Sequence, residues 1–343
     1  MSAAWRRSVM RPMLRSDIKK GLVMSIEIGY ALSSEEHSAR DLVRYAKRAE
    51  ETGFSFALIS DHYHPWLEVQ GQSPFVWSVL GGIAQATERI SLGTGVTCPI
   101  LRIHPAIIAQ AAATAASMME GRFFLGVGTG ENLNEHVLAR HWPPVHIRQE
   151  MLAEAVKLMR MLWRGGMNNY EGKYFSVEQA QVFTLPKQPP SIMVAAAASR
   201  SAEFAGSIGD GLISTAPNDN LVKKFRASDG GTEKPCFGQI TVCWAHRLEE
   251  AKQIAHKWWP VAALPGKLMS RLATPAEFEE AATLVSPDGL AEQLVLGPDP
   301  EAYLAGIESY HAAGFDHVYI HQVGPDQEGF FKFCEREIIP KLH

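Results

Sequence analysis

Phe56-Ala57-Leu58-Ile59-Ser60-Asp61-His62 is the stretch of the sequence from which the fold can be read. Four apolar residues are followed at once by a hydroxyl, a carboxylate and an imidazole. A short apolar run that ends in polar residues is typical of a strand buried on both faces, as in a parallel sheet. The stretch predicts a buried strand with chemistry at its carboxyl end.

The same pattern of a strand followed by a helix recurs eight times from residue 24 onward. Apolar runs predict strands over residues 25–30, 56–61, 90–96, 122–127, 192–198, 211–216, 237–245 and 317–323. Helical spacing predicts helices between them, for example over residues 39–53, which end at Gly53. Eight such units close as an α/β fold of the (β/α)8 TIM-barrel type.

An open doubly wound sheet is the competing architecture. It usually has a G-x-G-x-x-G turn after the first strand, whereas this chain has Gly29-Tyr30-Ala31-Leu32-Ser33 there. The barrel is therefore the expected fold. Two long excursions interrupt it, residues 165–190 before strand five and residues 260–300 before strand eight, and both are expected to cover the barrel mouth.

The composition narrows the class of protein. With 343 residues and a formal net charge of -4, the chain fits one barrel domain over residues 24–343 and gives no argument for nucleic-acid binding. It has no run of about 18 apolar residues, so no membrane span is expected. Four cysteines without paired spacing favour free thiols in the cytoplasm. The basic residues 1–23 are expected to be a disordered extension or a misassigned start.

The functional site is expected where the strands end, because barrel enzymes place their sites on the loops after the strands. Glu35 follows the first strand, Asp61 and His62 follow the second, and Thr129-Gly130-Glu131 follows the fourth. Carboxylates, an imidazole and several hydroxyls should therefore meet at one mouth. That composition is typical of a pocket that transfers protons.

Each of these residues also has a structural interpretation. His62 could be a hydrogen-bonded rim residue, Glu131 could cap the next helix, and Trp66 could belong to the core. Their shared position at one face favours function for all three. Separately, Ala197-Ala198-Ser199-Arg200-Ser201 enters a helix through small residues beside a positive charge, which suits an anion such as phosphate.

His62-Tyr63-His64 leaves a metal-dependent barrel hydrolase as a distant alternative, with other histidines completing the shell. In such hydrolases the histidine pair follows the first strand rather than the second, so no metal is expected here. A barrel that binds a ligand without catalysis is a third interpretation, which the converging carboxylates disfavour.

Four motifs carry a resemblance to a known family. They are Ser60-Asp61-His62-x-x-Pro65-Trp66, Gly93-Thr94-Gly95-Val96-x-x-Pro99, His104-Pro105-Ala106-x-Ile108-Ala109-Gln110 and Phe124-Leu125-Gly126-Val127-Gly128-Thr129-Gly130-Glu131-x-x-Asn134-Glu135. From about residue 26 onward the chain resembles the coenzyme F420-dependent dehydrogenases of the luciferase-like superfamily, related to F420-dependent glucose-6-phosphate dehydrogenase. The resemblance implies a barrel that binds an 8-hydroxy-5-deazaflavin, a two-electron hydride carrier.

The resemblance also implies roles for single residues. His62 would take the proton of a substrate hydroxyl, Glu131 would handle the proton at the reduced cofactor, and Trp66 and Glu35 would shape the reacting space. A non-proline cis peptide bond would lie at Gly95–Val96. The implied cofactor contacts are Asp61, Gly95, Val96, Cys98, Thr129, Gly130, Asn134, Ala197, Ala198, Arg200 and Ser201. Cys98 stands where relatives have threonine, and Ala197-Ala198 where they have two glycines.

The substrate end departs further from the resemblance. Members that bind a sugar phosphate use two lysines and an arginine. Here the implied substrate contacts are Thr215 and Asn218, in the loop after strand six. Asn218 stands in place of the first lysine. Without those charges a neutral sugar or alcohol is the expected substrate, rather than glucose 6-phosphate. An FMN-dependent luciferase-like monooxygenase is the nearest alternative. A homodimer is expected from the resemblance alone.

Overall fold

The computed structural model describes residues 26–228 and 230–342; the predicted extension over residues 1–23 lies outside this range. The run of residues 56–59 is a strand, as expected, and it is one of the eight parallel strands that form the barrel in the described part of the chain. These are β1 (Glu27–Leu32), β2 (Phe56–Ile59), β3 (Ser91–Thr94), β4 (Phe123–Val127), β7 (Ile192–Ala195), β8 (Gly211–Ser214), β9 (Cys236–Cys243) and β11 (His317–Gln322).

The eight strands pair in the order β9-β11-β1-β2-β3-β4-β7-β8, and β8 pairs back onto β9. The sheet therefore closes as a (β/α)8 barrel, which confirms the predicted fold and all eight predicted strands.

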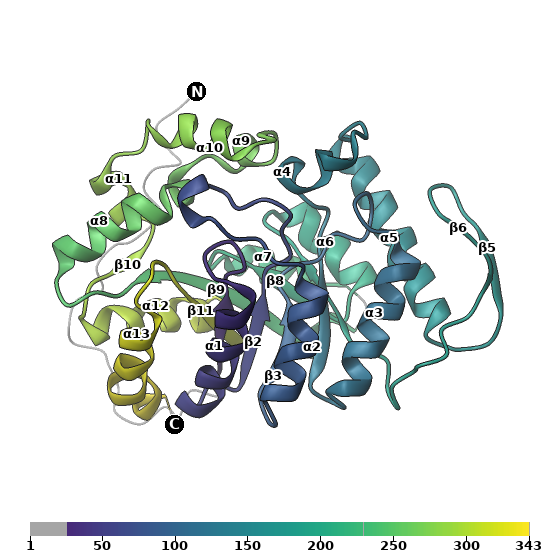
Figure 1. Ribbon diagram of the computed structural model, residues 1–343, viewed down its shortest axis with the longest axis horizontal. Coiled ribbons are helices and arrows are strands. Elements are labelled where there is room, and N and C mark those ends of the chain that lie inside the picture. Colours follow the sequence, from purple (N-terminus) through teal and green to yellow (C-terminus); the bar gives the residue numbers. More distant parts are fainter. Residues whose placement is uncertain (1–25, 229, 343) are drawn as a thin grey trace.

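Helices lie around the barrel (Figure 1). They are α1 (Ala39–Thr52), α2 (Val76–Ala86), α3 (Pro105–Met118), α4 (Asn132–Glu135), α5 (Val145–Leu162), α6 (Ser199–Ile208), α7 (Asp219–Arg226), α8 (Leu248–Trp258), α12 (Pro300–Ala312) and α13 (Gln327–Phe333). Local chemistry fixes their ends: the Ser38 side chain accepts a hydrogen bond from Asp41 N at the start of α1, and Gly53 ends that helix with φ of 105°. In the described residues no helix combines the length and the apolar character that crossing a membrane requires.

The barrel interior is filled with side chains. Strand residues alternate between the two faces of the sheet, so Phe56 and Leu58 point inward while Ala57 and Ile59 face the surrounding helices. The inward residues form one buried cluster of Phe56, Leu58, Phe124, Met193, Ile213, Phe237 and Tyr319. Because this cluster occupies the barrel centre, a ligand has room only at the mouth, above the carboxyl ends of the strands.

The two excursions lie where they were expected, and both contain secondary structure; the helices α10 and α11 of the second overlap helical pieces that the sequence predicts around residues 277–284 and 289–296. The first forms a hairpin of β5 (Asn168–Glu171) and β6 (Ser176–Ala180), which lies beside α5 (Figure 1). Its polar strands lack the alternation that would predict a strand. The second contains the turn η5 (Pro260–Ala263), α9 (Gly266–Met269), α10 (Pro275–Ala282), α11 (Pro287–Ala291) and β10 (Val295–Leu296). At two residues, β10 is too short to leave a pattern.

Candidate active site

A histidine–glutamate pair lies at the mouth of the barrel. His62 follows β2, and its Nε2 lies 3.2 Å from Oε1 of Glu35, which follows β1. The other oxygen of Glu35 accepts hydrogen bonds from Ser60 Oγ at 2.5 Å and from Ser33 Oγ at 3.1 Å. Ser60 continues the inward-facing register of Phe56 and Leu58, so the strand itself directs this hydroxyl to Glu35.

The hydrogen bonds of His62 place one proton in this pair. Its Nδ1 lies 3.1 Å from the carbonyl oxygen of His64, which can only accept, so Nδ1 carries a hydrogen. Nε2 then faces a carboxyl group, and the contact is favourable only if a proton lies between them. Burial alone raises the pKa of Glu35, but the charge of His62 and the hydrogen bond from Ser60 outweigh it and lower that pKa. A proton therefore lies between the imidazole and the carboxyl group.

Trp66 forms a wall beside this pair. Its ring centroid lies 5.0 Å from that of His62 and 5.1 Å from that of Phe278 on α10. Trp66 is buried in a small apolar cluster with Leu133, Phe278 and residues of η5. The second excursion thus covers the mouth at this side, as predicted, whereas the hairpin of the first is fastened to α5, where Glu154 accepts hydrogen bonds from three of its backbone N–H groups.

Glu131 lies at the end of the loop after β4 and provides a second acid–base group. It occupies the position before the first residue of α4, but its side chain makes no capping hydrogen bond there, which argues against the structural interpretation. Burial raises the pKa of Glu131 to about 7, with His62 and Arg148 acting against the shift and Glu35 adding to it. A carboxyl group with that pKa can give or take a proton near neutral pH.

Arg148, on α5, shapes the loop that carries Glu131. Its guanidinium donates to the carbonyl oxygens of Thr129 and Gly130 at 3.0 and 2.9 Å and lies 4.1 Å from the ring centroid of Trp142. No sequence pattern predicts this role, because an arginine in the first turns of a helix is ordinary. With its carbonyl groups held by Arg148, this loop is fixed in shape.

A second histidine–carboxylate pair lies beside the first and was not predicted. His321 at the end of β11 places Nε2 3.0 Å from Oε2 of Glu36, and Glu36 also accepts from Gly324 N. The ring of Trp259 lies 4.4 Å from the ring of His321. Glu36 sits beside Glu35 in sequence, so adjacent glutamates each hold a histidine.

Two of the implied cofactor contacts have internal partners. The Asp61 oxygens accept from Thr97 Oγ1 at 2.8 Å and from Arg102 at 2.7 Å. The Asn134 side-chain oxygen accepts from the backbone N–H groups of Tyr63 and His64 at 2.8 and 3.2 Å. These side chains therefore join the β2 loop to the loops after β3 and β4, whatever else they contact.

The loop after β3 has the peptide geometry that the resemblance implies. The Gly95–Val96 bond is cis. Gly130 adopts φ of 73° and packs over Cys98, whose Sγ would lie 2.4 Å from a Cβ at that position. A side chain at residue 130 would meet both a strained backbone and this sulfur, so glycine is required there.

The remaining implied contacts lie on the other side of the mouth. Ala197, Ala198 and Arg200 are exposed at the start of α6, where Ser201 Oγ accepts from Ala198 N at 3.1 Å. The first N–H groups of a helix, beside the guanidinium of Arg200, form a donor set that fits an anion. Thr215 and Asn218 are exposed after β8, and the Asn218 oxygen accepts from Leu221 N as the cap of α7.

The histidines that raised the metal alternative have separate partners. His62 faces Glu35, whereas His64 Nδ1 lies 3.1 Å from the carbonyl oxygen of Leu133. Within the described residues, no group of three or more histidine, cysteine, aspartate or glutamate side chains has the arrangement of a metal site.

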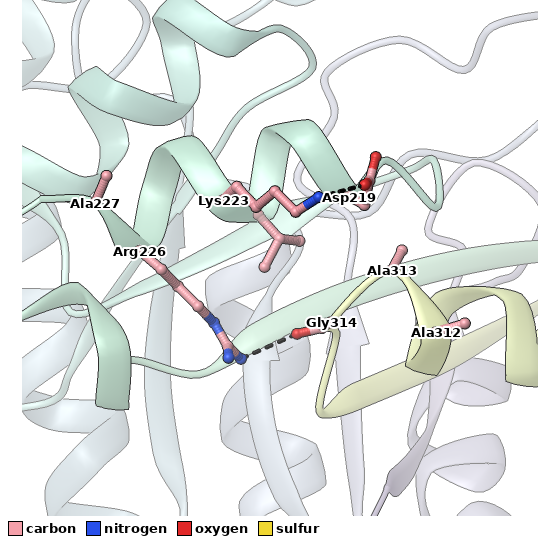
Figure 2. A pocket seen from close by; sticks show the side chains of 8 residues that line it. Asp219, Lys223, Arg226, Ala227, Ala312, Ala313 and Gly314 are labelled. Carbon is pink, nitrogen blue, oxygen red and sulfur yellow. Dashed lines mark hydrogen bonds and ion pairs between the residues drawn. The ribbon is translucent and has the colours of Figure 1, made fainter.

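A cavity of about 450 Å³ lies away from this site, between α7 and the end of α12 (Figure 2). Its charges are paired with one another or with the backbone: Lys223 binds Asp219, and Arg226 donates to the carbonyl oxygen of Gly314. None of the residues that line this cavity belongs to the acid–base site at the barrel mouth.

The fold is a (β/α)8 barrel with acid–base side chains at its mouth, and comparison with known proteins shows which family of such barrels it belongs to. Residues 18–317 match the family described as luciferase-like monooxygenase, so the chain belongs to that family. It is 33% identical to the F420-dependent glucose-6-phosphate dehydrogenase of Amycolatopsis mediterranei, over 92% of this chain and 98% of the relative.

Two solved structures are also similar to this chain. An F420-dependent secondary alcohol dehydrogenase in complex with an F420–acetone adduct superposes with a TM-score of 0.85 and 30% identity, over 93% of this chain and 99% of the other. The oxygenating constituent of 3,6-diketocamphane monooxygenase from Pseudomonas putida, in complex with FMN, has a TM-score of 0.68 and 19% identity over 93% and 99%. The second likeness shows the fold alone.

Proposed function

We propose that this protein is an F420-dependent dehydrogenase that transfers a hydride between a neutral hydroxylated small molecule and the deazaflavin. The observation that carries the proposal is the arrangement of two proton-transfer groups at one mouth, the His62–Glu35 pair and Glu131. The F420 dependence of the relative from Amycolatopsis and of the secondary alcohol dehydrogenase supports the same cofactor.

The residues present fit this cofactor. The donor set at the start of α6 suits its phosphate, and the loops after β3 and β4 border the space in which its ring would lie. The bound deazaflavin supplies the hydride chemistry. His62 would exchange a proton with the substrate hydroxyl, Glu35 would orient and stabilise the charged imidazole, and Glu131 would hold or release the second proton. Trp66 would exclude water from the reacting side.

A comparison of F420 and FMN binding tests the cofactor. We expect purified protein to quench F420 fluorescence in a saturable titration and to bind FMN far more weakly. Tight FMN binding without F420 binding would reverse the assignment in favour of a monooxygenase. A screen of alcohols and sugars followed by deazaflavin absorbance then identifies the substrate.

The substrate is proposed to lack a phosphate group. Asn218 caps α7 and is exposed. By the resemblance, Asn218 stands where the relatives have a lysine, and the exposed residues Glu292 and Gln293 stand near the position of the arginine. Each charge-assisted hydrogen bond that is missing removes about 1.5–3 kcal/mol of binding free energy. Turnover of glucose 6-phosphate should therefore be poor, and robust turnover with F420 would overturn this part of the proposal.

The protein is also proposed to be a homodimer and to work in the cytoplasm. An apolar surface supports the dimer: Trp77 of α2 and Ile107 and Met118 of α3 line a cavity of about 230 Å³, and Ile107 is 57% exposed. Free, buried thiols support the location, since Cys98, Cys236, Cys243 and Cys334 are all unpaired.

A further inference from the structure

Arg102 is a buried cation that contacts two loops of the site at once. Its side chain is only 8% exposed, and it extends from the long segment after β3. One guanidinium nitrogen lies 2.7 Å from Asp61 Oδ1 and 3.4 Å from the carbonyl oxygen of Asp61, in the loop after β2. Its Nε lies 3.6 Å from Oε1 of Glu135, in the α4 turn after β4.

The same residue holds Glu135 a second time. The backbone N–H of Arg102 donates to Glu135 Oε2 at 2.8 Å, so the main chain and the side chain of one residue both engage this carboxyl group. The side chains of Asp61 and Glu135 are 1% and 0% exposed. Water cannot replace Arg102 as their partner.

The two anchors are close in sequence to the groups that transfer protons. Asp61 directly precedes His62, and Glu135 lies one helical turn after Glu131, whose carbonyl oxygen accepts from Glu135 N. A shift of Arg102 would therefore be transmitted to His62 through one peptide bond and to Glu131 through one turn of α4.

Two buried carboxyl groups require a cation between them, which Arg102 supplies through hydrogen bonds to Asp61 and an ion pair with Glu135. Burial raises the pKa of Glu135, and Asp61 and Glu135 together raise the pKa of Arg102 although its own burial acts in the other direction. A lysine would supply the charge but only one point of contact, whereas the planar guanidinium spans both carboxyl groups.

We propose that Arg102 is a positioning residue that fixes the His62 loop and the Glu131 loop relative to each other. The alternative is that it only neutralises buried charge. The positioning role for catalysis rests on the proposed function, but the mechanical link between the loops does not.

Hydrogen exchange of the ligand-free Arg102→Lys variant tests the link directly. The lysine keeps the charge but loses the planar guanidinium that spans both carboxyl groups. Backbone amides in residues 60–66 and 129–136 should therefore both exchange at least about tenfold faster. The matched control is Arg226→Lys. Arg226 donates to Gly314 O and Asp316 at the opposite end of the barrel, so this variant should leave both loops unchanged.

Steady-state kinetics test the consequence. Misplaced proton-transfer groups should lower the kcat of Arg102→Lys by about tenfold to a hundredfold, while KM changes less than about threefold. Unchanged exchange in both loops, with wild-type kcat, would show that the charge alone is needed and would overturn the proposal. Faster exchange without any measurable turnover of wild-type protein would instead count against the proposed function.

Glu135→Gln provides a second route if Arg102→Lys does not fold. It removes a buried carboxyl group whose pKa is already raised, so the fold should tolerate it. Faster exchange in residues 60–66 after this change in the β4 loop would support the link through Arg102. Wild-type exchange there in the folded variant would overturn it.

Discussion

His62 and Glu35 share a proton in the resting site, and this determines which reactions His62 can begin. In the reducing direction the proton held between the two side chains can pass through His62 to a carbonyl oxygen. In the oxidising direction the pair must first lose that proton before His62 can act as a base.

Replacing the imidazole tests this role. We expect His62→Ala to lower kcat by about a hundredfold to ten-thousandfold, because the proton transfer loses its catalyst. F420 affinity, measured by fluorescence titration, should stay within a few fold. His311→Ala on the outer helix α12 is the control histidine variant and should retain activity. Near-normal turnover by His62→Ala would rule out its role as the acid–base group.

Glu131 should impose a pH limit of its own. Since its pKa is raised to about 7, the carboxyl group keeps its proton up to neutral pH and loses it above. A step in which Glu131 donates, as implied for hydride transfer to the cofactor, should slow as pH rises through about 7. In Glu131→Gln, kcat should be lower and this limb of the pH profile should disappear. A limb that persists in the variant would assign it to another group.

At the scale of elements, a single carboxyl group holds the turn between α2 and β3 onto α1. Glu50 of α1 accepts from the backbone N–H groups of Glu88, Arg89 and Ile90. Burial alone would raise its pKa, but these hydrogen bonds outweigh it and lower the pKa below the ordinary 4.5. Glu50 thus attaches the start of β3 to the helix layer.

Glu50→Ala should therefore destabilise the barrel by about 2–3 kcal/mol, since three donors lose their partner. The stabilisation belongs to the charged form with a lowered pKa, so it is present above about 4.5 and is lost as pH falls below that value. Urea unfolding at pH 7 and pH 4 measures both effects. Glu154→Ala is the matched control, because Glu154 holds the peripheral hairpin in the same way. An equal loss of stability at both pH values would contradict this account.

For the whole molecule, the apolar face of α2 and α3 is one surface that a single barrel leaves uncovered. Ile107 and Met118 project from it, 57% and 39% exposed. A closed two-fold contact between copies would bury the same face on both. Ile107→Glu should then convert the proposed dimer to a monomer in size-exclusion chromatography with light scattering. Wild-type protein that is already monomeric, or a variant that stays dimeric, would remove this face from consideration.

How much the sequence predicted depends on whether a feature is local. Strand β2 and the residues after it follow from a short apolar run, and the end of α1 follows from Gly53. Such signals involve neighbours in the chain. The hairpin of β5 and β6 and the short β10 were missed, because polar or two-residue strands are defined by their partners rather than by their own pattern.

The sequence alone determined the eight strand–helix units, and with them the barrel and the face on which His62, Glu35 and Glu131 lie. Hydrophobic periodicity and strand ends can be predicted because they depend on residues that are neighbours in the chain. Only the tertiary structure decided which partners surround each group there. The proton shared by His62 and Glu35, the raised pKa of Glu131 and the clamp made by Arg102 all arise from burial and from contacts between loops. Those contacts join residues tens of positions apart, and their strength depends on the exclusion of water that folding creates.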